Sequence, residues 1–410
     1  MQPNLTPIQI VREQVSQQLE LHVPTEIIAV TEALGRVVAD TLLAPENLPH
    51  TDNVAVDGYA VQLAALEANP QGWFPIVATI RAGHPFDGDI QPGEAAAVYT
   101  GGVRPDGVDC VFMHEDCRVE KGHVQIQITG RKGLNIRPAG ENLRQGEICV
   151  NAGDKLTPQD IGQLAAAGFE TISVKKRLSV HVLSTGDEVA NPDQPAAGQT
   201  QIADANGPML HALLAADGHK ADYGGIIPDD RSALSQAFQD GLAHADILIT
   251  SGGASDGQED HTQAAMADND IECLFWRIAM KPGRPMAIGQ KNGKLVICLP
   301  GNPVAVYVCY RLLVSGWLDQ LLGCQKTPML TVPVRAGFAH KKRNDRGEYL
   351  RVRLETGADG TVQMQLNGRK GAGVISSLQE ADGLVEIPMT ISQVEIGDSL
   401  AFLPFRESGL

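Results

Sequence analysis

The sequence predicts a multidomain protein that joins one open α/β domain to two β-rich domains and a helical layer. Its 410 residues are too many for one ordinary core, because domains usually span roughly 100 to 200 residues. From residue 177 onward, short apolar runs alternate with helical segments, which is typical of an α/β domain with a parallel sheet. Two other regions consist of short β-type runs broken by Gly and Pro, as in small all-β domains.

The N-terminal residues 1–45 and the later residues 140–176 are expected to form one linking domain of helical and extended structure. Residues 7–20 place apolar side chains at mostly helical spacing, and residues 26–42 are interpreted as another helical or mixed segment. In the later segment, Thr157 is expected to cap a helix that starts with a proline. Both halves of this domain therefore contribute packing elements.

The two β-rich domains and the α/β domain account for the rest of the chain. Residues 46–139 are expected to form a β-rich domain, and residues 327–410 a small C-terminal barrel or sandwich. In the α/β domain, residues 177–326, a long and largely buried helix is expected to end near Gly323. We therefore expect four structural parts, three of them globular.

The composition argues against several classes of protein. With 33 Lys and Arg against 49 Asp and Glu, the net charge is −16, which disfavours sequence-independent binding to nucleic acid or to an anionic membrane. The seven cysteines are scattered without a Cys-x-x-Cys pair, so neither a disulfide framework nor a zinc site is indicated. No signal peptide and no apolar stretch of about 20 residues is evident. We therefore expect a soluble protein of the reducing cytoplasm that binds neither nucleic acid nor membranes.

Three apolar runs of the α/β domain each lead into an unusual polar loop. The loops lie in residues 180–189, 246–260 and 295–306. In an open parallel sheet, ligands bind outside the carboxyl ends of the strands, so the three loops are expected to converge on one crevice. By itself the first loop is better explained by turn and capping chemistry, but the three together favour a binding site.

The second of these loops is richer than a surface turn requires. Its glycines would let the backbone approach an anionic ligand, and its acids would hold the hard cation that accompanies such a ligand. The acids are Asp256, Glu259 and Asp260. In the third loop, Gly301 stands between two prolines and opens a helix whose N-terminal amides favour an anion. Neither a Walker loop nor a Gly-x-Gly-x-x-Gly fingerprint is present, so phosphates would be bound without those motifs.

A short cationic segment lies between the second and third loops. It contains Arg277, Lys281 and Arg284, and a Pro-Gly turn presents two of the three cations. A solvated charge run is the usual explanation for such a segment. In an acidic protein, cations on a stiff turn beside glycine loops are better explained by the binding of a polyanion.

The remaining polar residues point to no other chemistry. The eleven histidines are dispersed without metal-ligand spacing, so each is interpreted as a structural or surface residue. Ser184, Ser251 and Ser255 have no evident histidine partner, so a Ser-His-Asp hydrolase is unsupported. Outside the α/β domain, the polar loops within residues 51–61 and 130–146 each read, alone, as a turn or a solvent-facing loop.

Seven motifs together resemble one family. "DNVAVDGYA", "YTGG", "GLNIRPAGEN", "STGDE", "SGGASDGQED", "KPGRP" and "LPGNPVAV" occur in the order seen in the molybdopterin molybdenumtransferases of the bacterial MoeA family, which is similar to the C-terminal region of gephyrin. The resemblance covers residues 5–405. It implies an elongated homodimer whose α/β domain binds molybdopterin. It also implies the reaction, in which adenylylated molybdopterin and molybdate are converted, with Mg²⁺, to molybdenum cofactor and AMP.

The resemblance also implies roles for individual residues. The implied catalytic residues are Asp57, Thr100, Glu188, Asp229 and Asp260, and the implied metal ligands are Glu188, Asp256 and Asp260. The implied substrate-binding residues are Ser184, Gly186, Ser251, Gly252, Gly253, Lys281, Arg284, Pro300, Gly301, Pro303, Arg351, Ser376 and Ser377. Among these, Arg351 and one of the two adjacent serines would face molybdate, which would place the site between domains.

Three positions depart from the family pattern. Asn142 stands where Asp is common, Ala305 where Ser is frequent, and Arg284 where a second Lys is usual. Two other functions remain open. One is an adenylyltransferase or nucleotide pyrophosphatase on the same α/β domain, and the other is a gephyrin-like scaffold. A molybdopterin adenylyltransferase is also a candidate partner.

Overall fold

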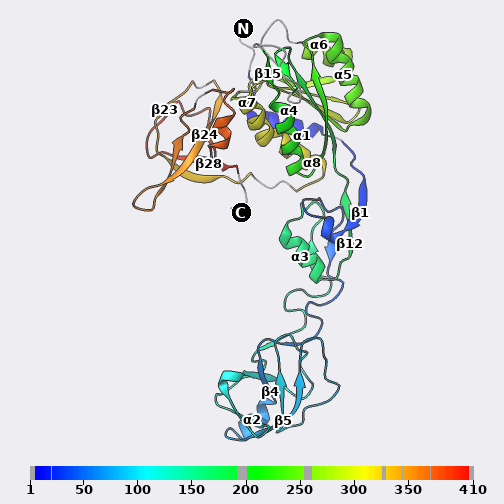
Figure 1. Cartoon of the computed structure of the whole chain (residues 1–410), viewed down its shortest axis with the longest axis vertical. Helices are drawn as coiled ribbons and strands as arrows, with labels where there is room; N and C mark the ends of the chain where they lie inside the picture. The colour runs from blue at the N-terminus through cyan, green and yellow to red at the C-terminus, as the bar shows by residue number, and fades with distance from the viewer. Residues whose placement is uncertain are drawn as a thin grey trace. The chain divides into compact units, whose positions relative to one another are not determined.

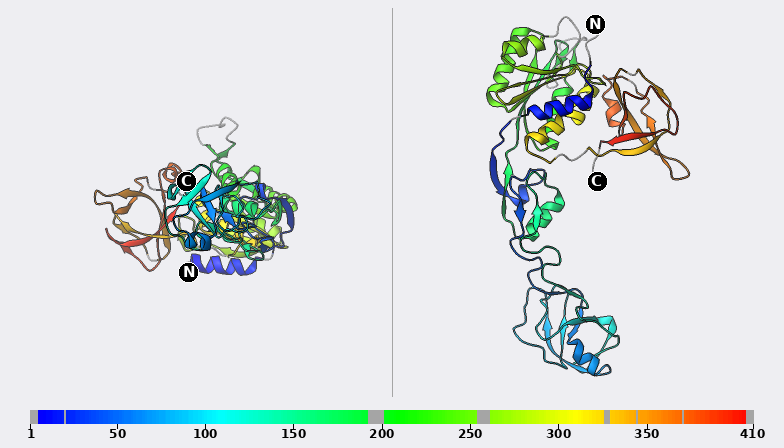
Figure 2. Two further views of the ribbon diagram at one scale, coloured as in Figure 1. Left: turned by 90° about the horizontal axis from the view of Figure 1, so that it is seen from below. Right: turned by 180° about the vertical axis from the view of Figure 1, so that it is seen from behind.

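The computed structural model of the chain contains two compact units. The smaller unit comprises residues 27–34 and 38–173, and the larger unit comprises the rest of the chain. Figures 1 and 2 show the chain from three sides. The structure describes residues 5–19, 21–191, 201–253, 261–325, 329–343, 345–369 and 371–405. No helix within these ranges has the length and apolar character that crossing a membrane would require.

The smaller unit contains the predicted β-rich domain. Its elements are β4 (Gly58–Val61), α2 (Leu63–Ala68), β5 (Phe74–Ile80), β6 (Ala95–Val98), β7 (Cys110–Met113), β8 (Cys117–Glu120) and β9 (His123–Ile126). The six strands form a sheet in the order β7-β4-β6-β5-β9-β8. Because successive side chains of a strand point to opposite faces, Tyr59 of β4 packs in one apolar cluster and Ala60 in another. The sheet is thus covered by apolar side chains on both faces.

Short strand pairs flank this domain in the chain. The elements are β1 (Thr25–Ala29), β2 (Leu42–Leu43), β3 (Asn53–Val54), β10 (Ile136–Arg137), β11 (Ile148–Val150), α3 (Pro158–Ala166) and β12 (Thr171–Lys175). β1 pairs with β12, β2 with β11, and β3 with β10. Thr157 caps α3 as predicted, since its hydroxyl accepts from the amide of Asp160 and the Asp160 carboxylate accepts from the amide of Thr157.

Of the two interpretations of residues 26–42, helical or mixed, the helical one is wrong. The segment is extended in β1 and β2, with one 3₁₀ turn at Val30–Glu32 between them. The physical reason lies in its β-branched residues, which favour strands over helices. Gly35, at φ +70, lies in a conformation that an α-helix does not contain.

The larger unit is built on a second six-stranded sheet. Its strands are β13 (Ser179–Thr185), β16 (Lys220–Ile227), β17 (Ile247–Ser251), β18 (Glu272–Trp276), β20 (Ala287–Lys291) and β21 (Lys294–Leu299). The order is β16-β13-β17-β21-β20-β18. The first four strands are parallel, as predicted. β20 runs antiparallel to β21, because Asn292 and Gly293 both adopt positive φ and form the tight turn of a hairpin. β18 in turn pairs antiparallel with β20.

Helices cover both faces of this sheet (Figure 1). They are α1 (Ile8–Gln18), α4 (Asn206–Ala216), α5 (Arg231–His244), α6 (Thr262–Asp268), α7 (Pro303–Cys309) and α8 (Ser315–Leu321). Apolar residues of α1, α4, α7 and α8 form one cluster with Val180 and Val182 of β13. Residues of α5 and α6 form the other cluster with Leu183 of β13. The predicted long helix is α7 and α8 joined by a π-helical turn at Tyr310–Val314.

The C-terminal part of the larger unit is a closed β-barrel, which decides between the two predicted forms. Its strands are β22 (Val332–Ala336), β24 (Gly347–Thr356), β25 (Val362–Leu366), β26 (Gly383–Ile387) and β28 (Ser399–Pro404). The order is β24-β25-β22-β28-β26, and β26 pairs back with β24. A short strand, β19 (Met280–Lys281), pairs in parallel with β24. The barrel is visible from two further sides in Figure 2.

Candidate functional site

The carboxyl ends of β13, β17 and β21 meet at one edge of the larger unit's sheet. Ser184 pairs with Ser251, and Ser251 pairs with Leu299. The amide of Gly252 donates to the carbonyl of Leu299 at 3.1 Å. A Cβ at Gly301 would lie 3.7 Å from the Cα of Gly252. The described beginnings of the loops after these strands therefore meet as predicted, and we call their shared edge the strand-end crevice.

Glycine is required where the second loop turns over the first strand. Gly252 has φ +96, and a Cβ there would lie less than 3.0 Å from both the carbonyl oxygen and the hydroxyl of Thr185. Gly253 and Gly186 also have positive φ, at +69 and +136. Gly252 and Gly186 are buried and Gly253 is partly exposed, so the absence of side chains here lets the backbones of the first two loops pack closely.

Sequence reasoning missed a buried carboxylate beneath the crevice. Asp204 is 6% exposed and accepts from the hydroxyls of Ser184 and Tyr223, each at 2.7 Å. It also accepts from the amides of Asn206 and Gly207 at the start of α4. Burial and the hydrogen bond to Asp204 raise the pKa of Tyr223 to about 12. Ser184 and Tyr223 are thus both donors to Asp204. The sequence feature that could have revealed Asp204 is an Asp two residues before the start of a helix.

Asn206 links α4 to the third loop. Its Nδ2 donates to the carbonyl of Gly301 at 2.7 Å. Its Oδ1 is buried and has no hydrogen-bond partner among the described residues. Because a buried acceptor without a donor is costly, this atom fits a ligand that brings an N–H or O–H group.

The predicted acids lie partly at the same edge. Asp187 and Glu188 are exposed in the first loop, and the amide of Asp229 donates to the Asp187 carboxylate at 3.2 Å. The amide of Gly186 donates to the carbonyl of Ile227 at 3.2 Å, which brings the end of β16 beside this loop. Asp256, Glu259 and Asp260 lie outside the described residues, so their roles stay predictions.

The cationic segment packs between α7 and the barrel. Gly283, at φ +114, leaves no room for a Cβ against Cys309 of α7. Lys281 is half exposed, and its Nζ lies 3.0 Å from Oε1 of Glu348. Glu348 is 3% exposed and also contacts Nε2 of His340 at 2.9 Å. Burial raises the pKa of Glu348, but the hydrogen bonds with His340 and Lys281 outweigh that effect and lower it.

Glu348 was not among the predicted residues. It lies 67 positions from Lys281 in the chain, and no local pattern marks it.

The predicted residues of the barrel gather around one loop. Nη2 of Arg351 donates to the carbonyls of Arg369 and Gly371, at 3.3 and 3.1 Å. Burial lowers the pKa of Arg351. Ser376 accepts from Nη1 of Arg369 at 2.8 Å. Ser377 is fully buried and donates to the carbonyl of Val374. Arg351 and Ser377 thus hold the loop, while Ser376 is more accessible.

This barrel loop reaches the third loop of the crevice. The amide of Val304, in the first turn of α7, donates to the carbonyl of Ala372 at 3.0 Å. A Cβ at Gly373 would lie 3.8 Å from Oδ1 of Asn302. One amide expected to favour an anion is therefore already bonded within the protein. Pro300 is buried, while Gly301 and Asn302 remain exposed.

In the smaller unit, Asp57 and Thr100 form one site. Oδ1 of Asp57 accepts from the amide of Thr100 at 2.7 Å and from its hydroxyl at 2.8 Å. The backbone hydrogen bond, followed by the hydroxyl bond, lowers the pKa of Asp57. Gly58 leaves no room for a Cβ against the carbonyl of Phe112, and this fixes the turn that presents Asp57. The two predicted residues are therefore neighbours in the structure.

Three family regions match nearly the whole chain. The MoeA N-terminal region (domain I and II) matches residues 6–168. A probable molybdopterin binding domain matches residues 181–320, and the MoeA C-terminal region (domain IV) matches residues 333–405.

Curated relatives and solved structures agree with these matches. A molybdopterin molybdenumtransferase of Haemophilus influenzae is 30% identical over 96% of this chain and 97% of its own length. The enzyme of the same name from a Nostoc species is 30% identical over 94% and 90%. The crystal structure of a molybdopterin biosynthesis MoeA protein from Pyrococcus horikoshii has a TM-score of 0.84 at 25% identity, covering 98% of this chain and 100% of that one. The chain therefore belongs to the MoeA family of molybdopterin molybdenumtransferases.

Proposed function

We propose that this transferase inserts molybdenum from molybdate into adenylylated molybdopterin, uses Mg²⁺, and releases AMP. The observation that carries the proposal is the strand-end crevice, where three glycine loops converge. Glycine-rich backbone at strand ends suits the phosphates of a pyrophosphate link, and Gly301 is its exposed part. The unpartnered Oδ1 of Asn206 would accept from a polar group of the pterin or the nucleotide. The names of the relatives agree with this substrate class.

We propose that the cations of the segment between the second and third loops neutralise the substrate's phosphates. Lys281 is half exposed. Its ammonium group can therefore contact a ligand and keep its hydrogen bond to Glu348. Arg284 lies on the same turn, and its guanidinium suits a phosphate better than a point charge does. The glycines would then shape the pocket, and the two cations would select for an anion.

The first loop offers candidate oxygen ligands for a magnesium ion. Asp187 and Glu188 are exposed there, and the amide of Asp229 bonds to the Asp187 carboxylate; Mg²⁺ prefers such oxygen ligands together with substrate phosphates. Bound there, the ion would supply charge neutralisation on the pyrophosphate link. Asp256 and Asp260 are proposed as further ligands from the resemblance.

Molybdate would lie near the barrel loop. Arg369 and Ser376 line its accessible side, and Arg351 ties its backbone in place. Arg and Ser donors suit a tetrahedral dianion. Replacing Arg351 with Ala should raise the molybdate concentration needed for half-maximal turnover. An unchanged molybdate dependence would mean that the barrel does not serve the oxyanion.

Asp57 would act as a fixed negative charge rather than as a general base. An aspartate is ionised near neutral pH in any case, and the further lowering of its pKa makes Asp57 a weak proton acceptor. Asp57→Ala and Asp57→Asn should therefore both stop AMP release while the protein stays folded. Normal turnover by either variant would remove Asp57 from the mechanism.

One assay separates this function from its rivals. Protein is incubated with adenylylated molybdopterin and Mg²⁺, with and without molybdate, and AMP is measured by chromatography. Molybdate-dependent AMP release supports the proposal. Equal release without molybdate would indicate a pyrophosphatase, and consumption of ATP with molybdopterin would indicate an adenylyltransferase.

The assembly and the partners are also proposals. A homodimer is expected from the resemblance, and light scattering of the purified chain tests it. The adenylyltransferase that makes the substrate is a candidate partner, because direct transfer would protect a labile adenylylated pterin. A gephyrin-like scaffold would retain partner binding in a variant that releases no AMP.

A further inference from the structure

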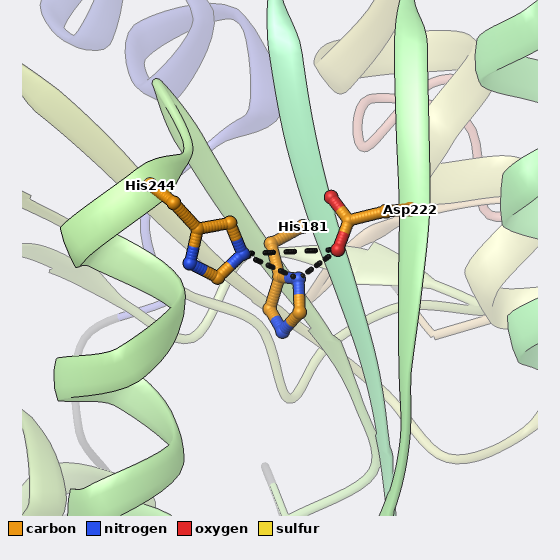
Figure 3. A group of neighbouring side chains, drawn as sticks. All are labelled: His181, Asp222 and His244. Atoms are coloured by element: carbon orange, nitrogen blue, oxygen red, sulfur yellow. Dashed lines mark hydrogen bonds and ion pairs between the residues drawn. The ribbon is translucent and has the colours of Figure 1, made fainter.

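Two histidines and an aspartate lie close together at the larger unit's sheet. They are nearer the start of the strands than the strand-end crevice is. His181 lies on β13, Asp222 on the edge strand β16, and His244 in the last turn of α5 (Figure 3). His181 and Asp222 are paired in register. His181 is three residues before Ser184, or about 10 Å along the strand. Among the described residues, no other three such side chains bring their ligand atoms this close.

The three ligand atoms lie close enough together for one ion to reach all of them. Nδ1 of His181 lies 2.6 Å from Oδ2 of Asp222 and 3.3 Å from Nε2 of His244, and the last two atoms are 3.8 Å apart. A point equidistant from three such atoms lies about 1.9 Å from each in their plane. An ion slightly above that plane would have three bonds of about 2.1 Å, the length of zinc bonds to imidazole and carboxylate.

Hydrogen bonding alone leaves this arrangement incompletely satisfied. Nδ1 of His181 faces both the carboxylate and the second ring nitrogen, yet a ring nitrogen has either one N–H or one lone pair. It can therefore serve only one of these neighbours well. A cation at the shared point would be bound by all three atoms at once.

One of the three side chains is buried, and the other two are half exposed. The side chain of His181 is 10% exposed, whereas those of Asp222 and His244 are each 53% exposed. Glycines make room for the buried ring, because a Cβ at Gly224 would lie less than 3.0 Å from its Nε2, and one at Gly241 would lie 2.9 Å from its Cδ2. A glycine inside α5 costs about 1 kcal/mol of helix stability, so the ring's position is built into both neighbouring elements.

We propose that His181, Asp222 and His244 bind a divalent transition-metal ion, with Zn²⁺ as the best fit. Two imidazoles and one carboxylate suit zinc, whereas Mg²⁺ prefers oxygen ligands alone. Three protein ligands leave a fourth position for water at the exposed side. The site is separate from the crevice and from its proposed magnesium ligands. It would join β13, β16 and α5 across three chain-distant segments.

Metal titration of the full chain tests the site. Protein freed of metal by a chelator is titrated with Zn²⁺ by calorimetry and with Co²⁺ by visible absorption, in excess Mg²⁺. The wild type should bind one equivalent of Zn²⁺, give a Co²⁺ spectrum of low coordination number, and melt at a higher temperature with zinc. His244→Ala and Asp222→Asn should each weaken zinc binding at least tenfold.

His211→Ala is the matched control, because His211 is an exposed histidine on α4. This variant should bind zinc as the wild type does. Zinc binding by His244→Ala and Asp222→Asn with wild-type affinity would overturn the proposal. So would a wild type that binds no zinc. Molybdate-dependent AMP release is measured in parallel, so failure of the metal site and failure of the proposed function are distinguishable.

Discussion

Replacing Gly252 with alanine should damage both the stability of the larger unit and its crevice. Gly252 has φ +96, and an added Cβ would lie less than 3.0 Å from the backbone oxygen of Thr185. The positive φ alone costs about 1–2 kcal/mol for an L-residue. Forcing a methyl group into packed surroundings costs about 1–3 kcal/mol more. We expect a loss of about 2–5 kcal/mol in the free energy of unfolding.

Gly323→Ala separates the two contributions. Gly323 has φ +75, and a Cβ there would meet nothing within 4 Å. This control should lose only the conformational part, about 1–2 kcal/mol. The difference between the two variants measures the clash in the crevice.

The assay is urea unfolding followed by tryptophan fluorescence. Trp73 belongs to the smaller unit, so a Trp73→Phe background leaves Trp276 and Trp317 as reporters of the larger unit. Release of AMP is measured on the same proteins, and Gly252→Ala should reduce it at least tenfold. If Gly252→Ala is no less stable than Gly323→Ala and turns over normally, the close approach at the crevice is refuted.

Three further predictions concern polar contacts. Thr100→Val removes the hydroxyl donor to Asp57 and keeps the amide donor, so the pKa of Asp57, followed by carbon NMR, should rise toward its ordinary value; an unchanged pKa would contradict this. Glu348→Gln should lower the free energy of unfolding at pH 7 by about 1–3 kcal/mol. Because the pKa of Glu348 is lowered in the fold, its contribution is present above the unfolded pKa of about 4.3 and is lost as pH falls through the folded pKa. The difference between wild type and variant should therefore shrink below about pH 4, and a constant difference would show that the charge is irrelevant. Asn206→Ala should raise KM for adenylylated molybdopterin more than it lowers kcat, whereas Asn269→Ala, whose amide bonds to Ser235 and Ala265, should leave KM unchanged; equal effects on KM would mean that Asn206 is only structural.

Much of the fold could be predicted from local sequence patterns. The cap at Thr157 and the glycines at the ends of the parallel strands follow from short-range chemistry, and the structure bears them out. The Asn292-Gly293 turn was an available hairpin signal for the antiparallel edge. The extended course of residues 26–42 was harder to predict, because apolar residues at mixed spacing suit a helix or a strand equally.

The parts of the sites that the sequence could not predict depend on contacts between residues far apart in the chain. Asp204 reaches Ser184 and Tyr223 only because α4 and two strands meet. Glu348 holds Lys281 across 67 positions, and His181 and His244 are 63 positions apart. No spacing rule links residues so distant, so dispersed histidines were interpreted singly.

The central claim is that the strand-end crevice and the barrel loop form one binding site for the nucleotide and the oxyanion. Diffraction from crystals grown with AMP, Mg²⁺ and molybdate tests it directly, because molybdenum can be located by its anomalous scattering. The account predicts AMP against the backbone of Gly252 and Gly301, with molybdenum beside the loop that carries Ser376. Molybdenum or AMP bound elsewhere on the larger unit, with the crevice empty, would contradict it.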